Sequence, residues 1–333
     1  MSHWDVFNGD ADGLCALQQL RLVHPREARQ VTGLKRDIAL LERVDAQPGD
    51  TLTVLDISLA RNREALEALL ARGVSVEYFD HHHAGPEPLP RHPALMLEIE
   101  AAPTRCTSLI VHRHLGGPHT AWAVTGAFGD GMLASARALG HAAGLDEARL
   151  DALRTLGEAI NHNAYGDTRA DVLIAPAALH ALMRPYADPL AFWRLERVAD
   201  ALIVRQREDL ARADALSPRW RLPAGAVYEL PNEAWARRVQ GSLAYRCAER
   251  EPEQACAVLR AAGPEAFVVT VRAPAHRPRG ADLLCLAFGG GGRATAAGID
   301  RLPRQRVDEF LLAFRHAFDP DASDRASPAR PGG

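Results

Sequence analysis

Four short polar clusters follow apolar runs of this chain in a fixed order. The clusters are residues 8–13, Asp56, residues 80–83 and residues 129–131, and the runs before them are 3–7, 51–55, 74–79 and 122–128. Each run has the length and apolar content of a buried β-strand. Ligands of parallel sheets bind at the carboxyl ends of the strands, so we expect the clusters to meet at one edge. Carboxylates and imidazoles at such an edge predict a site for divalent metal ions.

Helical patterns separate these runs and complete the predicted first domain. Leucines recur on one side of residues 13–23 and of residues 61–72. Alternating strands and helices predict an α/β fold with a mostly parallel sheet covered on both faces. Residues 132–185 look predominantly helical. We therefore expect the first domain to cover residues 1–188.

A linker and a second domain are expected next. Residues 189–216 contain few breakers, and their apolar residues lie near helical spacing, which predicts one long helix. Residues 217–318 predict a smaller α+β domain. Its expected elements are strands at 226–230, 255–259 and 266–272 and a helix at 233–249. Residues 319–333 are rich in Asp, Ser, Pro, Arg and Gly, and we predict a disordered tail there.

Composition and cysteine usage predict a cytoplasmic protein. With 47% apolar and 24% charged residues over 333 positions, the chain has the composition of an ordinary two-domain globular protein. No apolar run reaches the roughly 20 residues of a membrane span, and no secretory signal is visible. The five scattered cysteines favour buried thiols over disulfides or a zinc site. We expect no membrane partner, and a homodimer is left open.

Charge is distributed unevenly between the two predicted domains. Residues 1–216 carry 22 Arg and Lys against 29 Asp and Glu, a balance of −7. Residues 217–318 carry 15 Arg against 10 Asp and Glu, a balance of +5. An acidic part for cations beside a basic part for anions suits a metal-dependent enzyme for phosphorylated ligands, although chance fluctuation gives a similar difference. Lys35 is the only lysine, which we attribute mainly to genome composition.

The first cluster, NGDADG at residues 8–13, has two other interpretations. It matches the opening of a calcium-binding EF-hand loop, but that loop needs a Glu where Gln19 stands and a helix instead of a strand before it. It also matches a helix N-cap followed by a turn, and Asp56 alone fits an N-cap as well. The metal-site interpretation therefore depends on the coincidence of the clusters, not on any one of them.

The third cluster places three consecutive histidines after Asp80. With acidic neighbours, these histidines are expected to be ligands rather than surface residues. Adjacent side chains leave an extended backbone on opposite sides. We therefore expect His81 and His82 to face different partners, one a metal ion and the other the substrate.

Together these motifs resemble the DHH phosphoesterase superfamily, which includes RecJ-type exonucleases, nanoRNases, cyclic-dinucleotide phosphodiesterases and family II pyrophosphatases. The resemblance rests on GDADG at residues 9–13, Asp56, DHH at 80–82 and GD at 129–130. A further match, GGGRATAAG at 290–298, is similar to the glycine loop of the DHH-associated substrate domain. The motifs keep the family's order across residues 3–315.

The resemblance implies two metal ions, usually Mn²⁺ with Mg²⁺ as an alternative, that share Asp56 as a bridge. It implies Asp10 as a ligand of one ion. Asp12, His81 and Asp130 are the implied ligands of the other. Carboxylate-rich ligation with a little imidazole suits manganese better than zinc or copper.

The resemblance also implies catalytic and substrate-binding residues. His82 would face the phosphate or the leaving oxygen, and Asp80 would orient His81 or His82, so Asp80 and His82 join Asp56 as expected catalytic residues. The expected substrate-binding residues are Arg105, Arg272, Gly290, Gly291, Gly292 and Arg293. Thr104 and Thr107 lie close to Arg105 in the sequence, where relatives approach the substrate phosphate.

Three positions depart from the family pattern or compete with it. RecJ-like members have Asp where this chain has Asn8, and the family usually has histidine where this chain has Arg293. Arginine still offers a forked donor for a phosphate. Asp167 lies in a GDT sequence that some nanoRNase-like members share, but we prefer Asp130 because it follows a predicted strand.

The implied function is hydrolysis of short single-stranded oligonucleotides to nucleoside monophosphates by water that two metal ions activate. One alternative is a phosphatase or phosphodiesterase for a small ligand, such as a cyclic dinucleotide, a nucleoside 3′,5′-bisphosphate or polyphosphate. Another is a non-catalytic nucleotide-binding regulator, which Asn8 and Arg293 motivate. The clustered carboxylates and histidines argue against that last interpretation, because such groups are costly to keep together without chemistry.

Overall fold

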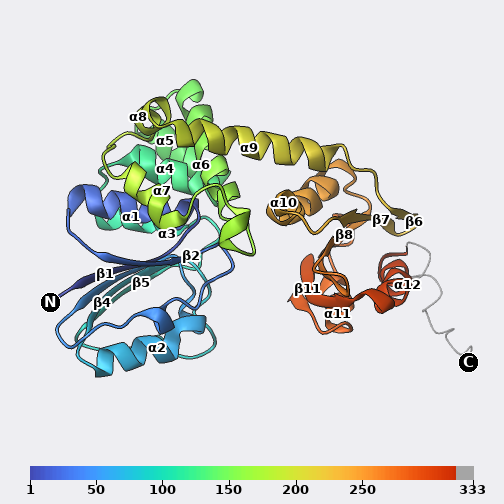
Figure 1. Cartoon of the computed structure of the whole chain (residues 1–333), viewed down its shortest axis with the longest axis horizontal. Helices are drawn as coiled ribbons and strands as arrows, with labels where there is room; N and C mark the ends of the chain where they lie inside the picture. Colours follow the sequence, from blue (N-terminus) through green and yellow to red (C-terminus); the bar gives the residue numbers. More distant parts are fainter. Residues whose placement is uncertain (320–333) are drawn as a thin grey trace, which may run out of the picture. The chain divides into compact units, whose positions relative to one another are not determined.

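The computed structural model of the chain describes residues 1–319, so the predicted tail lies outside the described residues from position 320 on. The chain divides into two compact units (Figure 1), a first unit, Met1–Arg207, and a second unit that begins at Glu208. Across the described residues, no helix combines the length and apolar character needed to cross a membrane.

The first unit is built on a five-stranded sheet in the order β2-β1-β3-β4-β5, and every neighbouring pair is parallel. The strands are β1 (His3–Asn8), β2 (Arg29–Gly33), β3 (Thr51–Leu55), β4 (Ser75–Asp80) and β5 (Leu95–Ile99). This confirms the predicted parallel sheet. The two edge strands, β2 and β5, were not predicted, because most of their residues are only partly buried and they lack a continuous apolar run.

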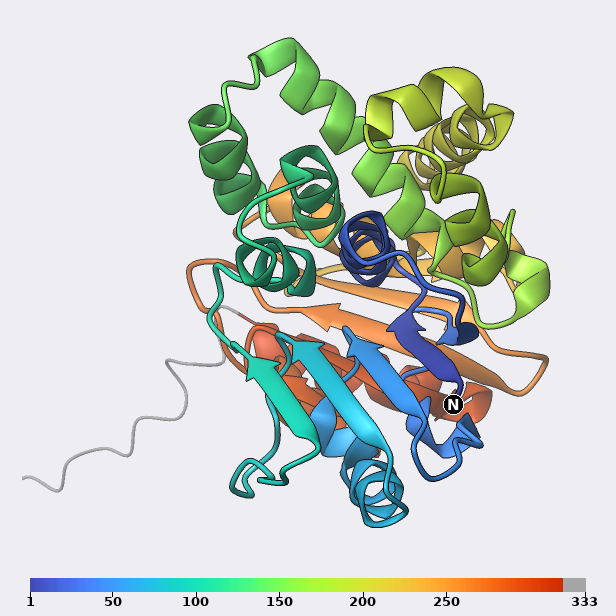
Figure 2. The ribbon, with the colours of Figure 1, turned by 90° about the vertical axis from the view of Figure 1, so that its left-hand side faces the viewer.

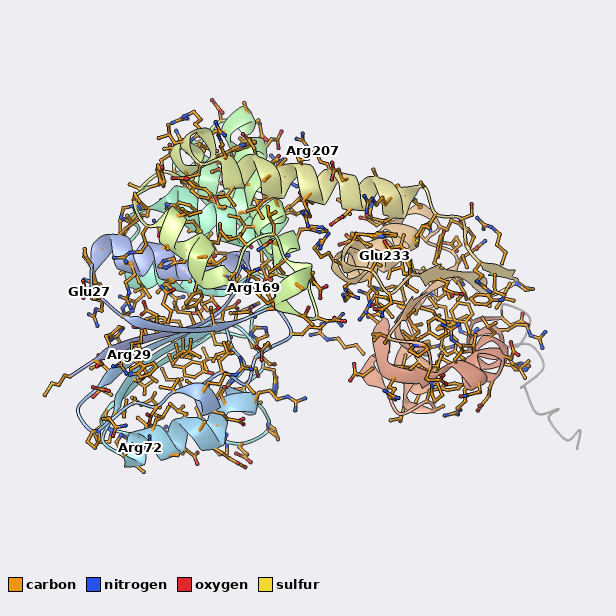
Figure 3. The ribbon with its side chains drawn as sticks, viewed as in Figure 1. Glu27, Arg29, Arg72, Arg169, Arg207 and Glu233 are labelled. Carbon is orange, nitrogen blue, oxygen red and sulfur yellow. The ribbon has the colours of Figure 1, made fainter. Side chains whose placement is uncertain are left out.

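Helices cover both faces of this sheet (Figures 1 and 2). Those of the first unit are α1 (Ala11–Val23), α2 (Leu59–Ala71), α3 (Thr107–His114), α4 (Thr120–Gly129), α5 (Leu133–Ala142), α6 (Glu147–Asn163), α7 (Pro176–Met183) and α8 (Pro189–Leu195). Alternate residues of each strand point to opposite faces, so Val6 packs with α2 while Phe7 packs with α1 and α6. Figure 3 shows side chains filling the space on both sides of the sheet.

The predicted strand at residues 122–128 is wrong, because this run lies in the helix α4. All residues from Trp122 to Gly129 are buried, so the run has no polar face to reveal a helical period. Close packing explains the burial. A Cβ added to Gly126 would lie 2.5 Å from the Ser108 hydroxyl and 2.9 Å from the Cys15 Cβ.

The predicted long helix between the domains is present, but it does not span all of residues 189–216. The structure has two helices there, α8 and α9 (Arg197–Asp214), with Glu196 between them in an extended conformation. The Tyr186 hydroxyl donates a hydrogen bond of 2.7 Å to the Glu196 carboxylate, a contact that sequence spacing does not predict. The division between the two units falls within α9.

The second unit contains a six-stranded sheet in the order β10-β11-β9-β8-β7-β6. Its elements are β6 (Trp220–Leu222), β7 (Gly225–Leu230), α10 (Ala234–Arg250), β8 (Ala255–Ala261), β9 (Ala266–Arg272), α11 (Ala281–Leu286), β10 (Gly291–Arg293), β11 (Ala296–Pro303) and α12 (Val307–Phe318). Within β8, Cys256 and Val258 pack with α10, whereas Ala257 and Leu259 pack with α11 and α12. The predicted α+β arrangement is therefore present, with three strands more than the sequence analysis predicted.

The glycine run near residue 290 forms a hairpin at the edge of this sheet. Gly291 pairs with Gly298 and Arg293 pairs with Ala296, antiparallel. The backbones approach so closely that a Cβ at Gly290 would lie 2.1 Å from the Gly298 carbonyl oxygen. The close packing of the hairpin is therefore sufficient to explain the glycine at position 290.

Candidate metal centre

Loops and helix ends of the first unit bring seven of the predicted residues together. Asp10 and Asp12 come from the turn into α1, and Asp56 directly follows β3. Asp80 is the last residue of β4, and His81 and His82 follow it. Asp130 is the C-cap of α4, so it reaches the cluster from a helix end and not from the expected strand.

The start of α1 positions the first two carboxylates. Asp10 is the helix N-cap, and its Oδ1 accepts a hydrogen bond of 3.1 Å from the Gly13 backbone N–H. Asp12 accepts bonds of 2.6 and 2.7 Å from the backbone N–H groups of Thr107 and Ser108, at the amino end of α3. The N-cap interpretation of this motif and its place in the cluster are therefore both correct descriptions of Asp10.

Asp56 has an uncommon backbone conformation. Its φ is +60°, in the left-handed region that only Asn, Asp and Gly adopt readily. Its backbone N–H donates 3.0 Å to the Phe79 carbonyl, and its Oδ1 accepts a 3.1 Å bond from the Thr107 hydroxyl. These contacts hold a strained residue with its carboxylate among the other acids, which is common at functional sites.

His81 lies at the centre of the cluster. Its Nε2 is 3.4 Å from Asp56 Oδ1, 3.7 Å from Asp130 Oδ2 and 3.9 Å from Asp12 Oδ2. Two sets of groups have ligand atoms within 4.8 Å of one another, and both contain His81. They are Asp12 with His81 and Asp130, and Asp56 with His81 and His82. Carboxylate oxygens and an imidazole nitrogen at this spacing fit a divalent ion such as Mn²⁺ or Mg²⁺.

The expectation that His81 and His82 face opposite sides is wrong. Their ring centroids are 4.5 Å apart, because β4 ends at Asp80 and the alternation of an extended strand no longer applies. His82 Nδ1 lies 2.7 Å from Asp80 Oδ1, so Asp80 orients His82 and not His81. The buried Asp80 Oδ2 finds no hydrogen-bond partner among residues 1–319.

Lys35, which the sequence analysis set aside, belongs to this cluster. Its Nζ is 2.5 Å from Asp10 Oδ2, 3.3 Å from Asn161 Oδ1 and 3.4 Å from Asp130 Oδ1. It also lies 5.5 Å from the centre of the Tyr165 ring. A lone lysine in a chain whose other fixed cations are arginines was the available signal.

Burial and mutual repulsion shape the charges of the carboxylates. Burial, followed by the charges of Asp10, Asp12, Asp130 and Asp80, raises the pKa of Asp56 well above its usual range. Burial also raises the pKa of Asp130, to about 6, with Asp12 adding to the rise and Lys35 opposing it.

Two further shifted groups of the cluster, Asp10 and His82, have a partner of opposite charge. Burial raises the pKa of Asp10, but Lys35 together with the hydrogen bonds from Gly13 and Asp56 outweighs burial, so the pKa lies below its usual value. Burial lowers the pKa of His82, but the hydrogen bond to Asp80 and the charges of Asp80, Asp10 and Asp130 together outweigh burial, so the pKa is raised. Asp56 and Asp130, whose pKa values are raised, are the carboxylates that a bound cation would stabilise.

Comparisons with known proteins identify the fold. No protein-family model matches the sequence, and no curated protein matches it either. A crystal structure of the exonuclease RecJ bound to manganese superimposes with a TM-score of 0.62 at 19% identity, over 98% of this chain and 91% of that chain. RecJ of Thermus thermophilus with Mn²⁺ gives 0.55 at 18% identity, over 99% of this chain and 53% of that chain. PggH, a pGpG-specific phosphodiesterase of Vibrio cholerae, gives 0.54 at 15% identity, over 95% of this chain and 99% of that chain. The chain has the DHH phosphoesterase fold.

Within this DHH fold, the rival ligand Asp167 does not join the cluster. It is an exposed residue of the loop after α6, and its backbone N–H donates 3.0 Å to the Asp171 carboxylate. Arg105 is exposed as well and pairs with Glu100 at 3.3 Å. Asp167 belongs to neither set of metal-ligand groups found in the described part of the chain.

The predicted substrate-binding residues of the second unit share one face of its sheet. Arg293 pairs with Ala296, and Ala296 pairs with Arg272 on its other side. Residues directly opposite each other on neighbouring strands point to the same face. Arg272 and Arg293 are therefore two strands apart on one face, beside the glycine hairpin, in an arrangement suited to an anion.

Proposed function

We propose that this protein is a metal-dependent phosphoesterase that hydrolyses short single-stranded oligonucleotides to nucleoside monophosphates in the cytoplasm. The observation that carries the proposal is the position of His81 at the end of the parallel sheet, where its Nε2 lies within 3.9 Å of carboxylate oxygens of Asp12, Asp56 and Asp130. The similar structures of RecJ with manganese and of PggH support the same chemistry. Five buried free cysteines support a reducing compartment.

Support for a short substrate comes from two observations. The chain covers 99% of PggH, a phosphodiesterase specific for the dinucleotide pGpG, and 91% and 53% of two RecJ chains. Aromatic residues make up 6% of the sequence, which is little for a surface on which many bases stack. We propose a substrate of a few nucleotides.

The roles of the residues follow from their contacts. A bound divalent ion would supply Lewis-acid activation of the phosphate and of the attacking water. Asp80 fixes the ring of His82, whose side chain is 42% exposed, so His82 is placed to give a proton to the leaving oxygen. The backbone N–H groups of Thr107 and Ser108 hold the Asp12 carboxylate in one orientation.

Substrate binding is assigned to arginines and glycines. Arg272 and Arg293 would hold a phosphate beside Gly290, Gly291 and Gly292, and of these glycines Gly291 is the one with open space around the position of an added Cβ. In the first unit, Arg105 would bind a second phosphate in exchange for its exposed pairing with Glu100. These contacts position the substrate and take no part in bond cleavage.

The test is a substrate survey with metal-stripped protein to which Mn²⁺, Mg²⁺ or no metal is returned. The substrates are pGpG, another 5′-phosphorylated dinucleotide, a single strand of 20 nucleotides, a cyclic dinucleotide, a nucleoside 3′,5′-bisphosphate and polyphosphate. We expect metal-dependent release of mononucleotides, fastest from the dinucleotides. A faster reaction with one of the last three would instead identify the protein as an enzyme of small phosphorylated ligands.

Two variants distinguish the proposed metal ligand Asp130 from the alternative ligand Asp167. Asp130→Asn is expected to lower the rate at least about 100-fold, whereas the exposed Asp167→Asn leaves it nearly unchanged. Nucleotide binding that needs no metal, without turnover of any substrate, would contradict the proposal and favour a regulator.

A further inference from the structure

The ammonium of Lys35 lies where a cation-binding site would be expected. Two carboxylates and one amide oxygen surround its Nζ, from Asp10, Asp130 and Asn161, at 2.5, 3.4 and 3.3 Å. The Tyr165 ring lies 5.5 Å from the same atom. Three oxygens from three separate elements, with an aromatic face beside them, form the kind of environment that holds a positive charge.

The backbone fixes Lys35 in this position. Its backbone N–H donates 3.1 Å to the Ala164 carbonyl at the end of α6. Two residues earlier, the Gly33 carbonyl accepts 3.0 Å from the Gly9 N–H. The segment that carries Lys35 is thus tied to the turn that carries Asp10 and to the helix that carries Asn161. The side chain is only 23% exposed, which distinguishes it from a solvated surface lysine.

Asp10 differs from Asp12 in the charge of its donors, because Asp12 accepts from two neutral backbone N–H groups whereas Asp10 contacts an ammonium. Oδ1 accepts from the Gly13 backbone and Oδ2 accepts from Lys35. Within residues 1–319, neither set of metal-ligand groups includes Asp10. Both sets include His81, and its Nε2 can bind only one ion at a time. The cluster therefore offers ligands for one ion, not for the pair that the family resemblance implies.

We propose that Lys35 takes the place of a second metal ion, so that the centre binds one divalent ion through Asp12, Asp56, His81 and Asp130. The ammonium is a permanent positive charge that neutralises Asp10, and it repels a second cation from the Asp10 oxygen that it already contacts. This inference rests on the proposed function, because it concerns the same metal centre. Lys35 is a charge-balancing residue in this scheme, and Asp10 is its partner and not a metal ligand.

The test counts ions on the metal-stripped full-length chain. Mn²⁺ is titrated by calorimetry, the bound ions are counted by native mass spectrometry, and electron paramagnetic resonance separates isolated Mn²⁺ from an exchange-coupled pair. We expect one ion per chain with an uncoupled spectrum. Two ions per chain would overturn the inference but leave the proposed function standing. No bound ion would overturn the proposed function itself.

A matched pair of substitutions tests the separate roles of the two acids. Asp10→Asn is expected to keep the single ion with less than about a threefold change in Mn²⁺ affinity, while Asp12→Asn loses at least about tenfold. An equal loss in both variants would make Asp10 a ligand and overturn the inference. Because the Asp10 substitution removes a carboxylate without changing size, it tests the idea even if lysine variants fold poorly.

Lysine variants test the charge directly. Lys35→Met removes the ammonium and keeps an unbranched chain, so we expect a second ion and a coupled spectrum. Lys35→Arg retains the charge and is expected to bind one ion. If Lys35→Met folds, as circular dichroism would show, and still binds only one, then the ammonium is not what excludes the second ion and the inference is wrong.

Discussion

Asp56 combines a left-handed backbone with a buried position among other carboxylates. Asp56→Asn removes one negative charge, keeps an acceptor for the Thr107 hydroxyl, and keeps a residue type that tolerates this backbone. We expect the metal-free variant to be more stable than the wild type by roughly 1–2 kcal/mol, the common size of a single-residue effect. Thermal unfolding with and without Mn²⁺ checks this.

The same experiment contains its own control. Wild-type protein should gain stability on binding Mn²⁺, and the Asp56→Asn protein should gain less, because it has lost a ligand oxygen of full charge. A variant that is less stable than wild type without metal would show that repulsion among the carboxylates is not a cost in this fold. Asp56→Ala would be less informative, since it adds backbone strain to the loss of charge.

Single residues also show what the sequence can reveal about the site. Recognisable motifs contain the five predicted metal ligands, so their clustering could be predicted. These ligands are Asp10, Asp12, Asp56, His81 and Asp130. Lys35 has no motif of its own, and its contact with Asp130 joins positions 95 residues apart in the chain. Only the three-dimensional path of the chain after β2 brings the lysine to the carboxylates.

At the scale of elements, α4 illustrates why local pattern is insufficient. Residues 122–128 are as apolar as a central strand, and periodicity cannot separate a buried strand from a buried helix. The three central strands β1, β3 and β4 were predictable, because turn residues bound them and polar clusters follow them. The edge strands and the break at Glu196 depend on partners distant in sequence, so no local pattern predicts them.

Helix α4 offers a direct test of how packing supports the site. Gly126→Ala would place a Cβ against Ser108 and Cys15, so we expect a loss of about 1–3 kcal/mol from overpacking. Because Asp130 caps the same helix, Mn²⁺ affinity should fall as well. Unfolding and metal titration measure both effects. The matched control is Gly241→Ala in α10, where nothing lies within 4 Å of the added Cβ; there we expect no loss of stability.

Helix α7 predicts a pH dependence of stability away from the metal centre. Burial lowers the pKa of His180 to about 4 from an ordinary 6.5, with Asp5 opposing this effect and Arg184 and Arg21 adding to it. Between about pH 4 and pH 6.5, His180 is therefore protonated in the unfolded chain and neutral in the folded chain. Stability is full above pH 6.5 and falls as the pH drops towards 4, by up to roughly 3 kcal/mol from this group.

His180→Asn isolates that contribution. The Asn amide oxygen can still accept the bond that Gln30 makes with His180 Nδ1 at 2.9 Å. Denaturant unfolding from pH 7.5 to 4.5 should show a smaller loss of stability in the variant than in the wild type. Parallel curves would mean that His180 takes up its proton without unfolding the contact between α7 and β2.

At the scale of the whole molecule, the chain forms two compact units, of which the first is acidic and the second is basic. The α/β unit and the α+β unit were both predictable, since the order of apolar runs changes near residue 189. Their division inside the continuous helix α9 was not, because a helix that belongs to two units has no composition break. The acidic clusters lie in the first unit, and the row of Arg293, Ala296 and Arg272 lies in the second.

The basic character of the second unit predicts a salt-dependent affinity for single-stranded substrate. Arg293 lies on the edge strand of the hairpin and shares a sheet face with Arg272, so Arg293→Gln should remove one phosphate contact. For single strands, each such contact contributes about 0.7 to the slope of log affinity against log salt. We expect that decrease in slope and a several-fold weaker affinity, measured by fluorescence anisotropy from about 50 to 200 mM salt.

A matched loss of charge separates contact from long-range attraction. Arg315→Gln on α12 removes the same charge from an exposed position, and it should leave the salt slope unchanged. If both variants lower the slope equally, only the net charge of the second unit attracts the substrate, and the hairpin does not bind phosphate. If neither does, the phosphate contacts lie in the first unit, and Arg105 becomes the residue to substitute next.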